Sequence, residues 1–280
     1  MRSQCLTAAF VFLGRRRYYH ADRLGIAVAQ DVVQHYGDSV QGRGTAMQSS
    51  NGNARAQYYW HDLKALIDGR GNHPSIFQWD TFNEQDMMHD FNTSNVVKWV
   101  QRYDNTRLVD TDSGGPANDL HVGDVDDMHV GGPSAKNLHK PGPHQYMMDG
   151  EYGNIEIWIA NHTWTDSANT SEVCRLYGNP TPKSPEISPP PAAVAAQIAA
   201  LAAAAKVVGN LSVASYVQLT DTEMECDGII SMDRTAKFSA AQIAEIKKAN
   251  DALVGEPTAC SPIPGVQEGQ GHAMPRWLWA

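Results

Sequence analysis

The sequence has little cysteine and no long apolar run. Its four cysteines, Cys5, Cys174, Cys226 and Cys260, include no C-x-x-C pair, which argues against a zinc ribbon. The spacing of the cysteines does not show which of them form disulfide bonds, and separate thiols are the simplest expectation. No stretch of about 18 apolar residues occurs, so the sequence predicts no membrane-spanning helix.

Basic residues are also scarce. Lysine and arginine together number 22 of 280 residues, the formal net charge is -9, and the basic residues are scattered along the chain. This distribution lacks the basic patch of a nucleic-acid-binding protein, so no nucleic-acid partner is expected. An acidic surface favours solubility, and it argues mildly against a strongly anionic polymer as a substrate.

The first residues lack the features of a secretory signal. A short apolar centre at residues 5–14 precedes Arg15, Arg16 and Arg17. A signal peptide has its basic residues first, followed by a longer apolar centre and a small-residue cleavage site. This segment is therefore not predicted to direct secretion, and no compartment is assigned.

The rest of the chain alternates short apolar runs with helical patterns. Runs typical of buried strands occupy residues 24–30, 75–82, 108–110, 125–130, 146–149 and 213–219, and helical patterns occupy residues 53–69, 95–103, 192–208 and 240–253. Pro191 fits the start of the third of these helices. Strands separated by helices predict an α/β fold with a parallel sheet that is buried on both faces.

Two of these strands are followed by a glutamate. Glu84 follows the run at 75–82, and Glu151 follows the run at 146–149, 67 positions after Glu84. In a (β/α)8 barrel the carboxyl ends of all strands meet at one face, so these two carboxylates can meet in space if about three βα units separate them. Two carboxyl groups about 5 Å apart are what the hydrolysis of a glycosidic bond with retention requires.

Four ordered stretches resemble glycoside hydrolase family 2, which includes β-galactosidases, β-mannosidases and β-glucuronidases. The most specific is Asn-His-Pro-Ser-Ile-x-x-Trp-x-x-x-Asn-Glu at residues 72–84, which is similar to the acid/base signature of that family. Gly-Glu-Tyr-Gly at residues 150–153 resembles the family's nucleophile at the end of strand seven. Residues 18–31 and 215–223 also match.

This resemblance implies a (β/α)8 TIM barrel that is incomplete. The predicted strands correspond to strands three to eight of the family barrel, whereas its first two strands and its N-terminal β-sandwich domains have no counterpart; residues 6–13 are a candidate substitute strand. We therefore expect an atypical segment at 1–17, a partial catalytic barrel at 18–254 and a disordered tail at 255–280. An unclosed parallel sheet would leave edges through which the chain could self-associate.

The resemblance also implies retaining hydrolysis of an O-glycosidic bond, with a carbohydrate substrate and no cofactor. Glu84 would be the acid/base, Glu151 the nucleophile, and Asn83 a ligand of the sugar 2-hydroxyl. Asp149 and Glu156 are neighbouring carboxylates that compete with Glu151 for the role of nucleophile.

Further sugar contacts are expected from residues at or beyond strand ends: Asp31, His129, Tyr152, Trp158 and Asp221, with Trp164 as a second flanking aromatic. Each of these residues also has a plain structural interpretation as a hydrogen-bonding or core side chain. The family usually has a tryptophan shortly before the aspartate at position 31, where this chain has Ala29.

Two rival interpretations stay open. Asp124, Asp126, Asp127, His121 and His129 are close in sequence, but alternation along a strand sends Asp126 to the opposite face from Asp127, and no metal-ligand spacing such as H-E-x-x-H occurs; no metal is expected. The rival function is a catalytically inactive barrel remnant, or a sugar-binding pseudoenzyme, that keeps the motifs without turnover. The motifs do not specify which sugar is cleaved.

Overall fold

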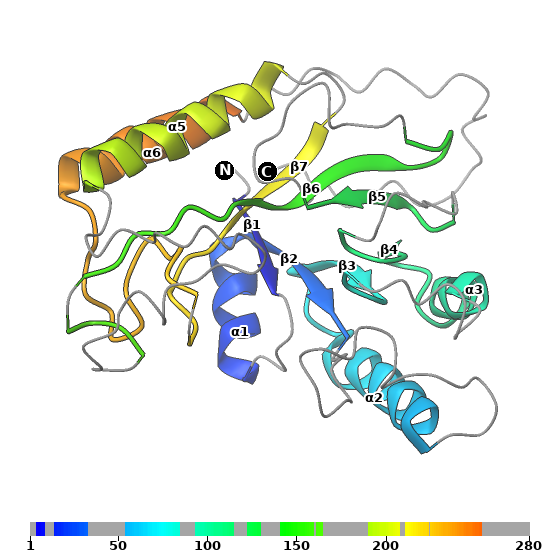
Figure 1. Cartoon of the computed structure of the whole chain (residues 1–280). Helices are drawn as coiled ribbons and strands as arrows, with labels where there is room; N and C mark the ends of the chain where they lie inside the picture. The colour runs from blue at the N-terminus through cyan, green and yellow to red at the C-terminus, as the bar shows by residue number, and fades with distance from the viewer. Residues whose placement is uncertain are drawn as a thin grey trace.

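The computed structural model describes residues 4–8, 14–32, 54–84, 93–114, 122–129, 141–159, 161–164, 190–207, 211–223 and 225–253. Seven strands form one sheet in chain order, and every neighbouring pair is parallel. They are β1 (Gln4–Ala8), β2 (Ile26–Asp31), β3 (Ile76–Asp80), β4 (Leu108–Asp110), β5 (Val125–Met128), β6 (Tyr146–Gly153) and β7 (Leu211–Val217). The sheet curls as part of a barrel, which confirms the expected incomplete (β/α)8 fold (Figure 1).

Five helices connect or flank these strands: α1 (Arg15–Leu24), α2 (Ala54–Arg70), α3 (Thr93–Tyr103), α5 (Pro191–Val207) and α6 (Ala240–Leu253). Helices α1, α2 and α3 lie along one side of the sheet, while α5 and α6 lie side by side near β7 (Figure 1). The start of α5 at Pro191 agrees with the sequence prediction, because proline is favoured in the first turn of a helix. Among the described residues, no helix is both long and apolar enough to span a bilayer.

Two elements near the N-terminus differ from the sequence prediction. Helix α1 places Arg15, Arg16 and Arg17 in its first turn, and it ends at Gly25, whose φ of 68° is the left-handed conformation that stops a helix. The candidate substitute strand lies earlier than expected, at Gln4–Ala8, where it pairs with β2. Residues of β1 also lie within 8 Å of residues of β7, measured between Cα atoms, so the two outermost strands of the described sheet approach each other.

The largest core lies between the strands and the first three helices. Val28, Trp79 and Val109 from β2, β3 and β4 pack with Leu63 of α2 and Val97 of α3, and all five are almost completely buried. A smaller apolar cluster contains Ala29, Val125 and Met148 together with partly buried neighbours. Because successive strand residues point to opposite faces, this second cluster lies on the concave side of the sheet.

Cys226 is disulfide-bonded, which corrects the expectation of separate thiols for this residue. It packs with Trp158 in a small buried cluster beyond the carboxyl ends of the strands. The tail predicted at 255–280 lies outside the described residues.

Candidate active site

Carboxylates gather where the parallel strands end. The last residues of β2, β3 and β4 are Asp31, Asp80 and Asp110, and all three are at most 2% exposed. Asp127 of β5 is also buried. Parallel strands deliver their carboxyl ends to one face, so an acidic layer covers the apolar cluster inside the sheet.

Glu84 and Glu151 meet above this layer. A carboxylate oxygen of each, together with a ring nitrogen of His129, lies within 4.8 Å of the other two atoms. The Glu84 side chain is 53% exposed and the Glu151 side chain is 17% exposed. One carboxylate therefore faces solvent, and the other lies deeper in the barrel.

The backbone around Glu84 fixes its direction. Glu84 has a φ of 49°, a left-handed conformation that is unusual for a non-glycine residue. Its N–H donates to the carbonyl oxygen of Ser113 at 2.9 Å, and Asn83 forms an isolated parallel bridge with Ser113. A strained residue that is held in this way is typical of a functional site.

His129 connects the two glutamates. Its Nδ1 lies 2.9 Å from Oε1 of Glu84 and 3.4 Å from Oε2 of Glu151, and its Nε2 lies 3.0 Å from Oγ of Ser113. The His129 side chain is only 7% exposed. The hydrogen bond to Glu84 and the charges of nearby acids raise the pKa of His129 to about 9 against the opposing effect of burial.

Asp127 supports this arrangement from below. It accepts a hydrogen bond from Oγ of Ser113 at 2.7 Å and another from the N–H of Gly150 at 2.6 Å. A Cβ at position 150 would lie 2.3 Å from Oδ2 of Asp127, so only glycine allows this close approach. Asp127 therefore fixes the backbone immediately before Glu151.

Burial is the main influence on the pKa of Glu151. Removal from water raises this pKa, the charge of His129 lowers it, and the charges of Glu84 and Asp127 raise it again, so that the pKa of Glu151 is about 7. The charge of Glu225, which follows β7 in the chain, also raises the pKa of Glu151.

Asp31 and Asp80 share the floor of the acidic layer. Burial raises the pKa of both, that of Asp80 to about 6, and each carboxyl group influences the pKa of the other. Oδ1 of Asp31 and Oδ2 of Asp80 have no hydrogen-bond partner in the described part of the chain. The pair is therefore most stable when it holds a proton.

Asp31→Asn is expected to stabilise the protein at pH 8 by on the order of 1 kcal/mol, because its amide replaces the shared proton with a permanent N–H donor. In the wild type, raised carboxyl pKa values mean that the folded state binds more protons than the unfolded state. Stability should therefore fall as the pH rises from about 4 through 6, and this fall should be weaker in the variant. Urea unfolding at pH 4, 6 and 8 measures the effect.

Asp68→Asn is the control, since Asp68 is an exposed carboxylate paired with Lys64 at 2.5 Å, which lowers its pKa. It should leave the fall in stability between pH 4 and pH 8 in place. An unchanged pH dependence in Asp31→Asn would contradict the shared proton.

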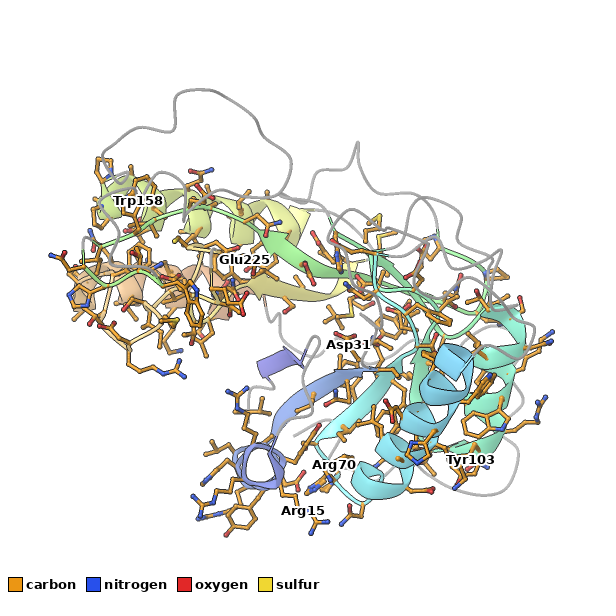
Figure 2. The ribbon with its side chains drawn as sticks, turned by 60° about the horizontal axis from the view of Figure 1, so that its bottom comes forward. Arg15, Asp31, Arg70, Tyr103, Trp158 and Glu225 are labelled. Carbon is orange, nitrogen blue, oxygen red and sulfur yellow. The ribbon has the colours of Figure 1, made fainter. Side chains whose placement is uncertain are left out.

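Three of the expected sugar contacts are buried against other parts of the protein. Tyr152 is buried, with its hydroxyl 3.3 Å from Oδ1 of Asn250 on α6. Trp158 is 8% exposed and lies at the end of the molecule that carries α5 and α6, well apart from Asp31 (Figure 2). Asp221 is buried and ion-paired with Lys237 at 2.5 Å.

Other expected contacts lie at or beside the site. Asn83 directly precedes Glu84, is 2% exposed, and its Oδ1 has no partner among the described residues. Asp31 lies in the acidic layer, where burial and the charges of nearby acids, including Glu151, raise its pKa. Trp164 is 52% exposed.

Sequence reasoning missed Ser113, Asp127 and Glu225 as members of the site. Asp127 lies one residue before the end of β5, within the predicted run at 125–130, and the sequence analysis considered it only as a metal ligand. Ser113 and Glu225 lie in connecting segments without a periodic pattern, so only the folded chain brings them to the glutamates.

The aspartates considered as metal ligands do not turn toward one common point near Asp124. Its Oδ2 accepts from the N–H of Val109 at 2.9 Å, whereas Asp127 binds Ser113 and Gly150; His121 lies outside the described residues. Within the described ranges, the group whose spacing would suit an ion is that of Glu84, His129 and Glu151.

The family model described as "Glycosyl hydrolases family 2, TIM barrel domain" matches residues 14–157, just over half of the chain. The chain belongs to glycoside hydrolase family 2. The match includes Glu84, His129 and Glu151. A search of curated proteins finds no match.

Solved structures of family 2 enzymes share the fold. A β-glucuronidase from an uncultured Clostridium sp. superimposes with a TM-score of 0.61 at 16% identity, over 89% of this chain and 44% of its own. A β-galacturonidase from Eisenbergiella tayi, bound to galacturonate, gives 0.60 at 13% identity, over 89% and 45%. The FMN-binding β-glucuronidase from Facaelibacterium prausnitzii L2-6 gives 0.57 at 16%, over 91% and 39%. The chain thus spans less than half the length of these family 2 structures.

Proposed function

We propose that this chain is a retaining β-glycosidase in which Glu84 is the acid/base and Glu151 is the nucleophile. The separation of their carboxylate oxygens, within 4.8 Å, carries the proposal. Retaining enzymes have carboxyl groups about 5–5.5 Å apart, whereas inverting enzymes separate them by about 6.5–9.5 Å to leave room for a water molecule. The short separation supports double displacement.

In the first step, the Glu151 carboxylate attacks the anomeric carbon while Glu84 donates its proton to the glycosidic oxygen. The bond between carbon and oxygen breaks, the aglycone leaves as an alcohol, and the sugar stays on Glu151 as an ester. In the second step, the Glu84 carboxylate takes a proton from water, and the resulting attack releases the sugar from Glu151 with its original configuration.

The exposures of the two glutamates suit these roles. Glu84 faces solvent, where aglycone and water exchange, and Glu151 lies deeper, where attack comes from beneath the sugar. Because the nucleophile must be ionised, a Glu151 pKa of about 7 predicts that kcat/KM rises through neutral pH.

Intact-mass analysis after incubation with 2-fluoro-glycosides tests the proposal. The panel contains galacto, manno and gluco probes, and also glucurono and galacturono probes because solved structures with the same fold are named for those sugars. We expect one glycosyl adduct in the wild type and in Glu156→Gln, a matched control that removes a nearby carboxylate, and none in Glu151→Gln.

The position of the adduct decides the assignment. An adduct that persists in Glu151→Gln but disappears in Glu156→Gln or Asp149→Asn would move the nucleophile to that residue. If folded wild-type protein forms no adduct with any probe, the chain is instead an inactive remnant or a sugar-binding pseudoenzyme.

A further inference from the structure

We propose that His129 is a positioning residue, a cationic clamp that holds the Glu84 and Glu151 carboxylates together and is itself held by Ser113 and Asp127. This inference rests on the proposed function, because it concerns the same two glutamates. It replaces the expectation that His129 binds a sugar hydroxyl.

The hydrogen bonds around His129 determine its protonation. Ser113 donates its hydroxyl proton to Oδ2 of Asp127, so its oxygen must accept from Nε2 of His129 at 3.0 Å. At the other end of the ring, Nδ1 faces Glu84 at 2.9 Å and Glu151 at 3.4 Å. When these two carboxylates are ionised, both ring nitrogens carry a proton and the imidazole is a cation.

The same geometry leaves no polar ring atom for substrate. Both nitrogens of His129 have partners within the protein, and its side chain is 7% exposed. A sugar hydroxyl would have to displace Glu84 or Ser113 to reach a nitrogen. The ring therefore acts on the reaction through the two carboxylates.

The support for the ring extends through three neighbouring strands. Ser113 and Gly114 follow β4, Asp127 belongs to β5, and the N–H of Gly150 on β6 donates to Asp127. Gly114 has a φ of 63°, and a Cβ there would lie 2.0 Å from the His129 ring. The ring is thus packed directly on a glycine whose conformation other residues rarely adopt.

Acidic groups surround the imidazolium from every side that the structure describes. Glu84 lies beyond β3, Asp80 at the end of β3, Asp127 on β5, and Glu151 on β6. Glu225, beyond β7, acts on both glutamates. Without a cation among them, Glu84 and Glu151 would repel each other at their short separation whenever both are ionised.

Steady-state kinetics of His129→Gln on the substrate identified by trapping tests the clamp. Loss of the cation makes Glu151 harder to ionise, so the acidic limb of kcat/KM should move upward by about one to three pH units. KM should change little. Ser113→Ala should shift the limb in the same direction by less, which guards against misfolding of the first variant.

His162→Gln is the matched control, since it removes another pair of a histidine and a carboxylate, with Nδ1 2.6 Å from Oδ2 of Asp233. It should leave the limb unchanged. A raised KM with an unshifted limb in His129→Gln would identify a sugar ligand and overturn the clamp. A loss of activity with neither change would identify a structural role and overturn it as well.

A titration by NMR separates this inference from the proposed function. We expect the imidazole signals that are lost in His129→Gln to titrate well above the usual histidine range in the wild type, and to return towards it in Glu84→Gln and Glu151→Gln. This result in a protein without turnover would reject the glycosidase and keep the clamp. An ordinary titration of His129 would reject the clamp even in an active enzyme.

Discussion

Glu151→Ala is expected to lower turnover of an activated β-glycoside by on the order of 10⁴- to 10⁶-fold, because it removes the proposed nucleophile and with it the covalent intermediate. Azide fits the space left by the carboxylate and can attack the anomeric carbon directly. It should restore turnover and give an α-glycosyl azide. Initial rates and the anomeric configuration of the product measure both effects.

Glu84→Ala should lose about 10²- to 10⁴-fold, the usual contribution of proton transfer. The loss should be smallest with leaving groups that need no protonation, and azide should give a β-glycosyl azide through the intact intermediate on Glu151. These opposite configurations make the two variants controls for each other. Exchanged configurations would reverse the roles of the two glutamates, an assignment that the raised pKa of Glu151 makes the main competitor.

Lys237→Met is expected to destabilise the protein by about 3–5 kcal/mol, because it leaves the carboxylate of Asp221 buried without its partner. The ammonium of Lys237 lies 2.5 Å from Oδ1 of Asp221, and also donates to the carbonyl oxygens of Ile157 and Cys226. These contacts join the segments that follow β6 and β7. Urea unfolding at pH 7 measures the change in free energy.

Lys247→Met is the matched control for this stability prediction. Lys247 pairs with Asp251 at 2.7 Å on the surface of α6, and its loss should change stability by less than about 1 kcal/mol. The double variant Lys237→Met with Asp221→Leu should recover much of the lost stability, because both charges are then absent. Equal effects of the two lysine substitutions would show that the Lys237 pair is not desolvated.

The acidic layer also bears on the stability of the site. Asp31, Asp80, Asp110 and Asp127 are all buried, and burial raises the pKa of each. Such a layer lowers the free energy of unfolding at neutral pH. Functional sites commonly have a destabilising effect of this kind. We infer that the carboxyl end of the barrel is shaped for its chemistry at the expense of stability.

Most of the strands and helices could be predicted from the sequence. Six strands and the helices α2, α3, α5 and α6 were expected within a few residues of their observed bounds, because buried parallel strands and amphipathic helices leave local apolar patterns. Helix α1 was not expected, since its arginine-rich start hides its short buried face, which includes Tyr18 and Ala21. Strand β1 has only five residues, and the bounds of so short a strand are difficult to predict from the sequence.

The sequence by itself determined the family and identified the two glutamates as the candidate catalytic pair, because motifs such as Asn83-Glu84 and Gly150-Glu151 are contiguous in the chain. Only the tertiary structure decided what surrounds those glutamates. Asp221 became the partner of a lysine 16 positions away, and His129 became a bridge between Glu84, which follows β3, and Glu151 on β6. Contacts of this kind depend on which strand ends lie side by side and on the charge that each buried group meets, and neither is encoded in a local pattern.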